Sequence, residues 1–200
     1  MKKYAFVILI LIALLLICPV KYQNTNSYNN KAYYPLDQLQ NDYSLADAKV
    51  DNCVVYENGD ITYGQSVWDS FTAKTQKGKP ATVRLAFYYT LDAPSHYAKE
   101  YYESIKAEYP VLYIKDLRFD GNKYVIAGFE EGTLYEKEYK YMMKYKGEPR
   151  SPSALFQKYT RYVLVNDNTA TWEDIEDGAL SSRFGASIDN YPVYTDLTWK

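Results

Sequence analysis

The sequence predicts an α+β fold. We expect one domain with a mainly antiparallel sheet, two or three short helices on one face of that sheet, and an N-terminal membrane helix before it. Three observations favour this fold: an apolar run near the start, β-rich runs that alternate with short helical segments over residues 41–200, and short turns between the later strands. Strands joined by short turns pair antiparallel, and the accompanying helices must cover an apolar sheet face.

The leader, residues 1–21, combines a basic start with an apolar run. Lys2 and Lys3 precede apolar residues from Tyr4 to Val20, and Lys21 closes the run. A helix of this length measures roughly 25 Å, near the lower limit for crossing a membrane. The two lysines at the start favour a cytoplasmic N terminus, which places the bulk of the chain on the extracellular side of the cell membrane as a single-pass protein.

Three interpretations of the leader are open at this stage. An uncleaved signal-anchor is favoured, because Leu14–Ile17 and Val20 are bulky where a cleavage site needs small residues. A cleaved signal peptide ranks second. A lipoprotein ranks third, since Ile17 stands before Cys18 where lipidation needs a small residue. Residues 22–40, rich in Asn, Tyr and Ser, predict a polar tether, and residues 41–200 a single extracellular domain.

The charge and the cysteines restrict the partners and the compartment. Without the three leader lysines, 20 of the 23 basic side chains remain against 25 acidic ones, a net charge of −5. This acidic balance argues against a nucleic-acid partner, which needs a basic surface. Cys53 is the only cysteine after the leader, so the domain folds without an internal disulfide and Cys53 is expected in the core.

Tyrosine is unusually frequent, with 24 residues in 200. Tyrosine suits a half-buried strand face, where the ring packs and the hydroxyl stays hydrated. The ordinary interpretation is therefore a one-sided antiparallel sheet. The alternative is an aromatic surface that stacks on sugars or peptides.

The first half of the domain contains two predicted helices and three predicted strands. Ser44 is a candidate N-cap for a helix over residues 44–49. Asn58-Gly59 predicts a tight turn between two strands. A helix over residues 65–77 ends at Gly78, and a strand follows at residues 81–90. The expected inward residues are Val67, Trp68 and Phe71 on the helix and Val83, Leu85, Phe87 and Tyr89 on the strand.

The second half continues with a helix, several strands and a last helix. Ser95 is a candidate cap for a helix with Tyr97, Ala98, Tyr101, Tyr102 and Ile105 on its inner face. Asp120-Gly121 predicts a hairpin. Residues 139–146 alternate Tyr or Met with Lys, which indicates one strand of a continuing meander whose lysines protect an edge. Thr171 and Asp174 predict a capped helix with Trp172, Ile175 and Ala179 inward, ending at Gly185.

The sequence contains no catalytic motif, and we assign no catalytic, cofactor-binding or metal-binding residues. His96 is the only histidine, so neither a metal site nor a pairing with Cys53 is supported. Glu130 and Glu131 point to opposite faces of a strand, and Asp116 is the other carboxylate near that hairpin. The Asp167-Asn168 pair near Glu173 lacks the spacing of a calcium loop, and a turn with a helix cap explains it better.

The segments CVVYENGDITYGQSVWDSFTAKTQKGKPATVRLAFYYT and IKDLRFDGNKYVI resemble a family of small exported proteins of Gram-positive bacteria, often lipoproteins, known only as a domain of unknown function. The resemblance covers roughly residues 45–130. Two departures are the inserted stretch DAPSHYAKEYYESIKAEY and the poor context of Cys18. The segment YVLVNDNTATWEDIEDGALSSR looks like uncharacterised membrane-anchored proteins of gut bacteria. The resemblance implies a location at the outer face of a cell membrane and no catalytic residues.

Two hypotheses about function follow. The first is a non-catalytic binding module at the cell surface, anchored to the membrane by its N-terminal helix, that contacts another envelope protein, a peptide or a glycan. The alternative is a carboxylate-dependent hydrolase acting on cell-envelope polymers, which requires two carboxylates roughly 5–10 Å apart in a cleft. Whether the protein is an enzyme is uncertain from the sequence, although the missing motifs favour a binding module.

Overall fold

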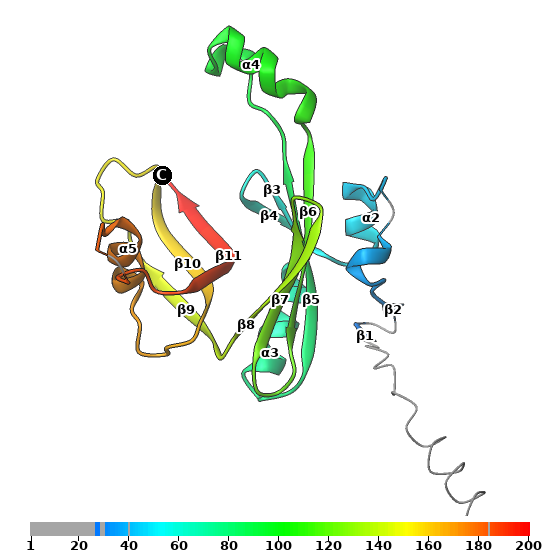
Figure 1. Ribbon diagram of the computed structural model, residues 1–200, viewed down its shortest axis with the longest axis vertical. Coiled ribbons are helices and arrows are strands. Elements are labelled where there is room, and N and C mark those ends of the chain that lie inside the picture. Colours follow the sequence, from blue (N-terminus) through cyan, green and yellow to red (C-terminus); the bar gives the residue numbers. More distant parts are fainter. Residues whose placement is uncertain (1–26, 29–30, 40, 184) are drawn as a thin grey trace, which may run out of the picture.

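The computed structural model describes residues 27–28, 31–39, 41–183 and 185–200. After a short hairpin of β1 (Ser27–Tyr28) and β2 (Lys31–Ala32), these residues form a six-stranded and a three-stranded sheet. Figure 1 shows the larger sheet in the middle, the smaller sheet on one side of it and α2 on the other.

The larger sheet has the strand order β4-β3-β5-β6-β7-β8. Only β3 and β5 pair in parallel, because α3 lies between the β3–β4 hairpin and β5 in the sequence; every other neighbouring pair is antiparallel. The strands are β3 (Val54–Glu57), β4 (Asp60–Tyr63), β5 (Ala81–Tyr89), β6 (Val111–Phe119), β7 (Tyr124–Glu130) and β8 (Thr133–Tyr139).

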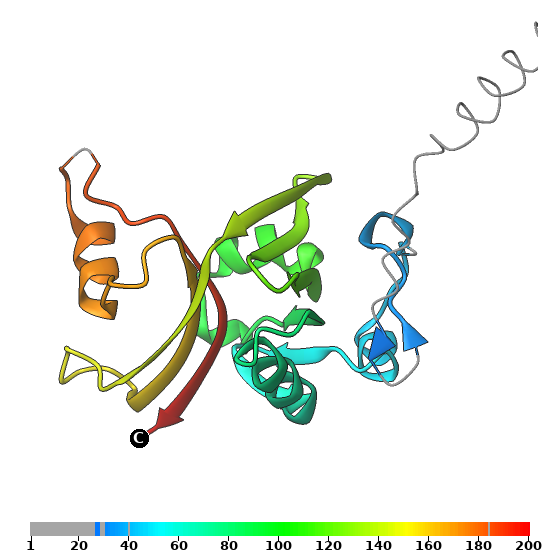
Figure 2. The ribbon, with the colours of Figure 1, turned by 90° about the horizontal axis from the view of Figure 1, so that it is seen from below.

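The smaller sheet is antiparallel, with the order β11-β10-β9. Its outer face is covered by α5 (Trp172–Leu180), whose Ile175 packs against Val163 and Val165 of the central strand. Its inner face is turned toward the larger sheet (Figures 1 and 2). The strands are β9 (Tyr141–Gly147), β10 (Phe156–Val165) and β11 (Asn190–Trp199).

The main core lies between the two sheets and α3 (Gln65–Thr75). Trp68 of α3 is almost completely buried; its ring stacks on Tyr194 of β11 at 4.5 Å and meets Tyr162 of β10 edge-on at 5.1 Å. The aromatic residues of α3 thus join the two sheets into one apolar core. As expected, Trp68 and Phe71 face inward and Gly78 follows the helix with a positive φ.

The opposite face of the larger sheet carries a smaller cluster. α2 (Leu45–Val50) and the 3-10 helix η1 (Leu36–Gln38) lie on this side, and Ala48 packs with Cys53, Val55 and Ala86. Ser44 caps α2 through a capping box with Asp47, and Thr171 caps α5 through a capping box with Asp174. Both predicted N-caps are therefore confirmed.

The predicted fold class is wrong in its architecture. The chain forms two sheets instead of one, and the helices lie on both faces of the larger sheet and on the outside of the smaller one. The helix count is also higher than expected. Across the described ranges, no helix combines the length and the apolar character needed to span a membrane. The N-terminal membrane helix expected within residues 1–21 lies outside the described residues.

The two sheets replace the expected meander because the strand predicted over residues 139–146 is interrupted. Tyr139 ends β8 in the larger sheet, Lys140 is exposed, and Tyr141 begins β9 in the smaller sheet. Lys140 donates its backbone N–H to the Asn166 side chain, which supports the crossing point. The expectation that the lysines lie on an edge strand holds for β9, which ends the smaller sheet.

Three local predictions also need correction. The helix expected from Ser95 is instead η2 (Pro94–His96), α4 (Lys99–Ile105) and η3 (Lys106–Glu108), and none of its residues is buried. Figure 1 shows α4 projecting beyond the sheets. The hairpin predicted at Asp120-Gly121 is confirmed as β6 and β7, but a two-residue type I′ turn, which this dipeptide favours, is replaced by a four-residue loop in which the Asp120 carboxylate accepts two backbone N–H groups. In the last helix Gly178, not Ala179, is buried, and the helix ends before Gly185.

Candidate functional site

A cleft of about 620 Å³ lies between the two sheets, and we call it the inter-sheet cleft. It begins where the apolar core ends. Its volume lies in the range typical of small-molecule sites. The inter-sheet cleft is lined by Tyr56, Gly59, Phe87, Tyr89, Tyr113, Lys115, Phe129, Glu130, Tyr135, Lys137, Tyr191, Pro192, Val193, Tyr194 and Thr195.

Aromatic rings form the floor and one wall of the inter-sheet cleft. Tyr56 and Phe87, neighbours on the parallel strands β3 and β5, stack at 4.8 Å with nearly parallel rings. Tyr89 and Tyr113 face each other at the ends of β5 and β6 in an edge-on pair at 6.2 Å. Tyr113 is 51% exposed, so its ring offers a surface to molecules that enter the cleft.

Two lysines extend over the same tyrosine. The Lys115 ammonium lies 5.1 Å from the ring centres of both Phe87 and Tyr191, and the Lys137 ammonium lies 6.0 Å from the Tyr191 ring. Neither ammonium forms an ion pair with a carboxylate among the residues that the structure describes. Cation–π contacts orient these groups but leave their charges uncompensated.

Two tyrosine hydroxyls connect the sheets across the inter-sheet cleft. The hydroxyls of Tyr135 on β8 and Tyr191 on β11 share a hydrogen bond of 2.8 Å. Burial and this bond raise the pKa of Tyr135 to about 12. Gly128 makes room for the Tyr135 ring, since a Cβ at that position would lie 2.9 Å from the Tyr135 hydroxyl oxygen. A larger residue than glycine at position 128 would therefore collide with the Tyr135 ring.

A buried hydroxyl on the cleft floor has no partner. Tyr56 is only 3% exposed, and its hydroxyl oxygen makes no hydrogen bond in the described structure. The Thr195 backbone is nearby, outside hydrogen-bonding geometry, and burial raises the pKa of Tyr56 well above its ordinary value. A buried unpaired hydroxyl costs free energy, and because this oxygen has almost no exposed surface it is part of the packed floor of the cleft.

The inter-sheet cleft contains one carboxylate among its lining residues, Glu130. Glu131 lies in the β7–β8 turn with a positive φ and does not line the cleft. Asp116 follows Lys115 on β6, so its side chain points to the opposite face of the sheet. The three carboxylates considered from the sequence are therefore not brought together in the cleft.

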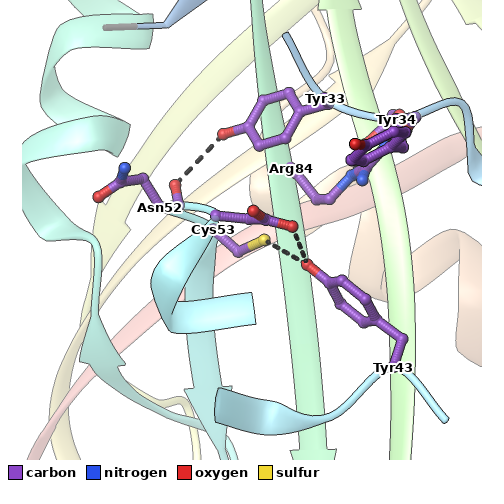
Figure 3. Close-up of polar contacts among 8 residues, drawn as sticks. Tyr33, Tyr34, Tyr43, Asn52, Cys53 and Arg84 are labelled. Atoms are coloured by element: carbon purple, nitrogen blue, oxygen red, sulfur yellow. Dashed lines mark hydrogen bonds and ion pairs between the residues drawn. The ribbon is translucent and has the colours of Figure 1, made fainter. Parts of the chain in front are cut away.

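The far face of the larger sheet contains a buried charge pair (Figure 3). Arg84 of β5 is completely buried and binds Asp116 at two points, through Nε to Oδ1 at 2.7 Å and Nη2 to Oδ2 at 2.9 Å. Its Nη2 also donates to the backbone carbonyl of Tyr34 at 2.6 Å, and the guanidinium lies over the Tyr33 ring. Burial opposes the charge, but the bonds to Asp116 outweigh it and raise the pKa of Arg84.

Residues 33–39, which we call the strap, close this face. The Tyr33 hydroxyl donates to the Asn52 carbonyl (Figure 3). Leu36 of η1 is buried, and η1 contacts β6 of the larger sheet. We expected these residues in the tether, but they pack on the domain. Arg84 therefore has a structural role: it is held by the bidentate pair with Asp116 and fixes the strap to the sheet.

Cys53 lies in the same cluster and is buried, as predicted. Its sulfur is 3.7 Å from the Tyr43 hydroxyl, which also donates to Asp51 (Figure 3). Burial raises the pKa of Cys53 to about 12, so the thiol stays protonated at neutral pH. A protonated, inaccessible thiol is a poor nucleophile.

The other residues considered from the sequence lie away from the inter-sheet cleft. His96 is exposed in η2, with its Nδ1 4.0 Å from an Asp92 oxygen. Asp167 accepts hydrogen bonds from the backbone and hydroxyl of Thr169, which confirms a turn. In the described segments, no three His, Cys, Asp or Glu side chains are grouped so that they could hold a metal ion.

The sequence interpretation missed Lys115 and Lys137, although β6 contained a usable signal. Val83, Leu85 and Phe87 of β5 pair with Leu117, Lys115 and Tyr113 of β6, so Lys115 occupies an inward position in an otherwise apolar face. A lysine at such a position indicates either a solvent-filled cleft or a buried ion pair. Without the strand register, the two cases could not be distinguished.

Comparison of the chain with family models, with curated proteins and with solved structures gave no match.

Proposed function

We propose that this protein is a non-catalytic binding module that acts at the cell surface and holds its ligand in the inter-sheet cleft. The ligand class at this level is a glycan, a peptide or a segment of another envelope protein. The observation that carries the proposal is a cleft of about 620 Å³ with an exposed aromatic ring, Tyr113, and two lysines that form no ion pair with a described carboxylate. Apolar surface with a few converging polar groups is the usual composition of a ligand site.

Nothing in the inter-sheet cleft favours the alternative, a carboxylate-dependent hydrolase of envelope polymers. Hydrolysis of this kind needs an acid and a second carboxylate on opposite sides of the scissile bond. Glu130 is the single carboxylate of the described lining, and Asp116 is bound to Arg84 on the opposite face of the sheet. The cleft offers aromatic rings for stacking and two ammonium groups for binding a negative charge. Both kinds of group bind a ligand without reacting with it.

The proposed location rests on the leader. The lysines at its start and the apolar run after them are typical of exported chains. Sequencing of the mature N terminus from intact cells tests this part of the proposal. Retention of Met1 with the domain accessible to external protease supports attachment at the cell surface, whereas a domain found in the cytosol contradicts the proposal.

The binding proposal can be tested with the full-length chain in mild detergent. The chain would be applied to arrays of oligosaccharides and of peptides, with Tyr113→Ala as the variant that removes the cleft wall. Tyr101→Ala is the matched control, because Tyr101 is 57% exposed on α4, outside the cleft lining. We expect Tyr113→Ala to weaken binding of the retained probes about tenfold, since one stacked ring contributes roughly 1–3 kcal/mol. Equal binding by both variants would place the ligand elsewhere.

A further inference from the structure

We propose that the ligand of the inter-sheet cleft is an acidic saccharide, a sugar ring that carries an anionic group. This inference rests on the proposed function and specifies its ligand. Neither lysine of the cleft forms an ion pair with a described carboxylate, while the chain as a whole has an excess of acidic residues. A local positive charge in an acidic molecule favours an anionic ligand and repels cationic ones.

The positions of Lys115 and Lys137 indicate a single anionic group. Both ammonium groups lie near the Tyr191 ring, at 5.1 and 6.0 Å from its centre, one extending from β6 and the other from β8. Each ammonium also lies near a second ring, that of Phe87 for Lys115 and that of Tyr135 for Lys137. Two cations beside one tyrosine ring, from the strands on either side of β7, can bind the same carboxylate or phosphate.

The remaining surface of the inter-sheet cleft suits a sugar. Its lining combines rings and hydroxyls from the face of the larger sheet with residues of β11, the edge strand of the smaller sheet. Tyr89 and Tyr113 offer rings for stacking. The hydroxyls of Tyr135 and Tyr191 offer partners for sugar hydroxyls.

The position of Glu130 adds selectivity. Glu130 lines the inter-sheet cleft. The pKa of Tyr191 is raised mainly by burial, and the nearby charge of Glu130 raises it further. A carboxylate beside two ammonium groups leaves a net charge of about +1, which suits a ligand with one acidic group and opposes a dense polyanion. A nucleic-acid strand, with a charge on every unit, is disfavoured by the same balance.

The test compares two trisaccharides of the same linkage, one made of glucose and one with glucuronic acid as its central sugar, by calorimetric titration of the full-length chain. We expect the acidic trisaccharide to bind at least about fivefold more tightly than the neutral one, and this preference to shrink at high salt. The same trisaccharide with a phosphate in place of the carboxylate separates the two sources of the anionic group. Preference for either one supports the inference.

Lys115→Met and Lys137→Met keep most of the lysine stem and remove the charge, so each should abolish most of the preference for the acidic trisaccharide over the neutral one. Lys144→Met is the matched control, because Lys144 also lies over a tyrosine ring, 5.0 Å from the centre of Tyr162, but outside the cleft lining. Thermal unfolding of each variant verifies that the domain is folded.

The outcomes distinguish this inference from the proposed function. Equal affinity for acidic and neutral trisaccharides, or a preference that both lysine variants retain, overturns the inference while the binding module stands. Binding of a peptide probe in the inter-sheet cleft, with no binding of any saccharide, also overturns the inference alone. Failure of every glycan and peptide probe to bind in a Tyr113-dependent manner overturns both.

Discussion

Removing the carboxylate of Asp116 should destabilise the domain more than any surface substitution. The Arg84 side chain is completely buried, and Asp116 supplies two of its three hydrogen bonds, at 2.7 and 2.9 Å. Asp116→Ala leaves a buried guanidinium without its counter-charge, which typically costs about 3–5 kcal/mol. Since a domain is stable by roughly 5–15 kcal/mol in total, this is a large fraction of the free energy of unfolding.

The assay is urea unfolding of Asp116→Ala, Arg84→Met and the double variant. Because Arg84→Met removes the charge and keeps an apolar chain, the double variant should lose less free energy than the two single losses added together, by at least about 1 kcal/mol. The matched control is the exposed pair of Arg118 and Glu136, which meets at 2.8 Å on the same sheet face. Arg118→Met should cost less than about 1 kcal/mol.

Two results would refute this reasoning about the buried pair. A loss below about 1 kcal/mol for Asp116→Ala would mean that the guanidinium finds water or another acceptor once Asp116 is removed. Additive losses in the double variant would mean that the two side chains do not stabilise each other. Either result would remove the explanation of how the strap is held on the sheet.

Three further predictions concern pH, the buried thiol and a glycine. Burial raises the pKa of both Tyr139 and Tyr194 to about 12. An unfolded tyrosine ionises near pH 10, so the free energy of unfolding should be constant below pH 10 and fall between about pH 10 and 12. Urea unfolding as a function of pH measures this, and a rise in stability over that window would contradict the assignment. Cys53 should resist thiol reagents at neutral pH until the domain unfolds, as followed by mass spectrometry of its peptide, whereas rapid labelling in native buffer would show an accessible thiol. Gly178→Ala should lower the free energy of unfolding by about 1–3 kcal/mol, because the added Cβ would lie 2.5 Å from the Ala186 carbonyl oxygen. An unchanged midpoint of urea unfolding would indicate that the loop containing Ala186 moves aside freely.

Local signals in the sequence predicted local structure well. Ser44 and Thr171 cap their helices as expected, because an N-cap is determined by residues within one turn. Asn58 and Gly59 form the predicted two-residue turn between β3 and β4, and both adopt positive φ. Such features depend on a few neighbouring residues, so they can be read from the chain alone.

Long-range features were not visible in the same way. The alternation of residues 139–146 continues across Lys140 without a glycine or proline, so nothing in the pattern marked the passage from one sheet to the other. In β5, Arg84 alternates with the apolar residues Val83 and Leu85, so its side chain lies on the other face of the strand. A charged residue at such a position normally indicates a solvent-exposed face. The burial of Arg84 is caused by the strap, which lies about 50 residues earlier in the chain.

The candidate site could be predicted only in part. The abundance of tyrosine left open a stacking surface for sugars or peptides, and six tyrosines line the inter-sheet cleft. Their assembly depends on β3, β5, β6, β8 and β11, which come together only through the sheet order and the packing of the two sheets. The lysines that determine the proposed ligand charge required the register of β6 as well.

The most direct test of ligand binding in the inter-sheet cleft uses a fluorescent reporter. Tyr113→Trp places an indole in the cleft wall; the native tryptophans Trp68, Trp172 and Trp199 lie outside the lining, and their emission, measured on the unsubstituted chain in the same titration, is subtracted. Tyr101→Trp on α4 is the control. On titration with the glucuronic-acid trisaccharide, we expect a saturable change in emission from Tyr113→Trp and none from Tyr101→Trp. A change of equal size in both variants, or binding measured by calorimetry without any change in the Tyr113→Trp emission, would contradict the assignment of the cleft as the ligand site.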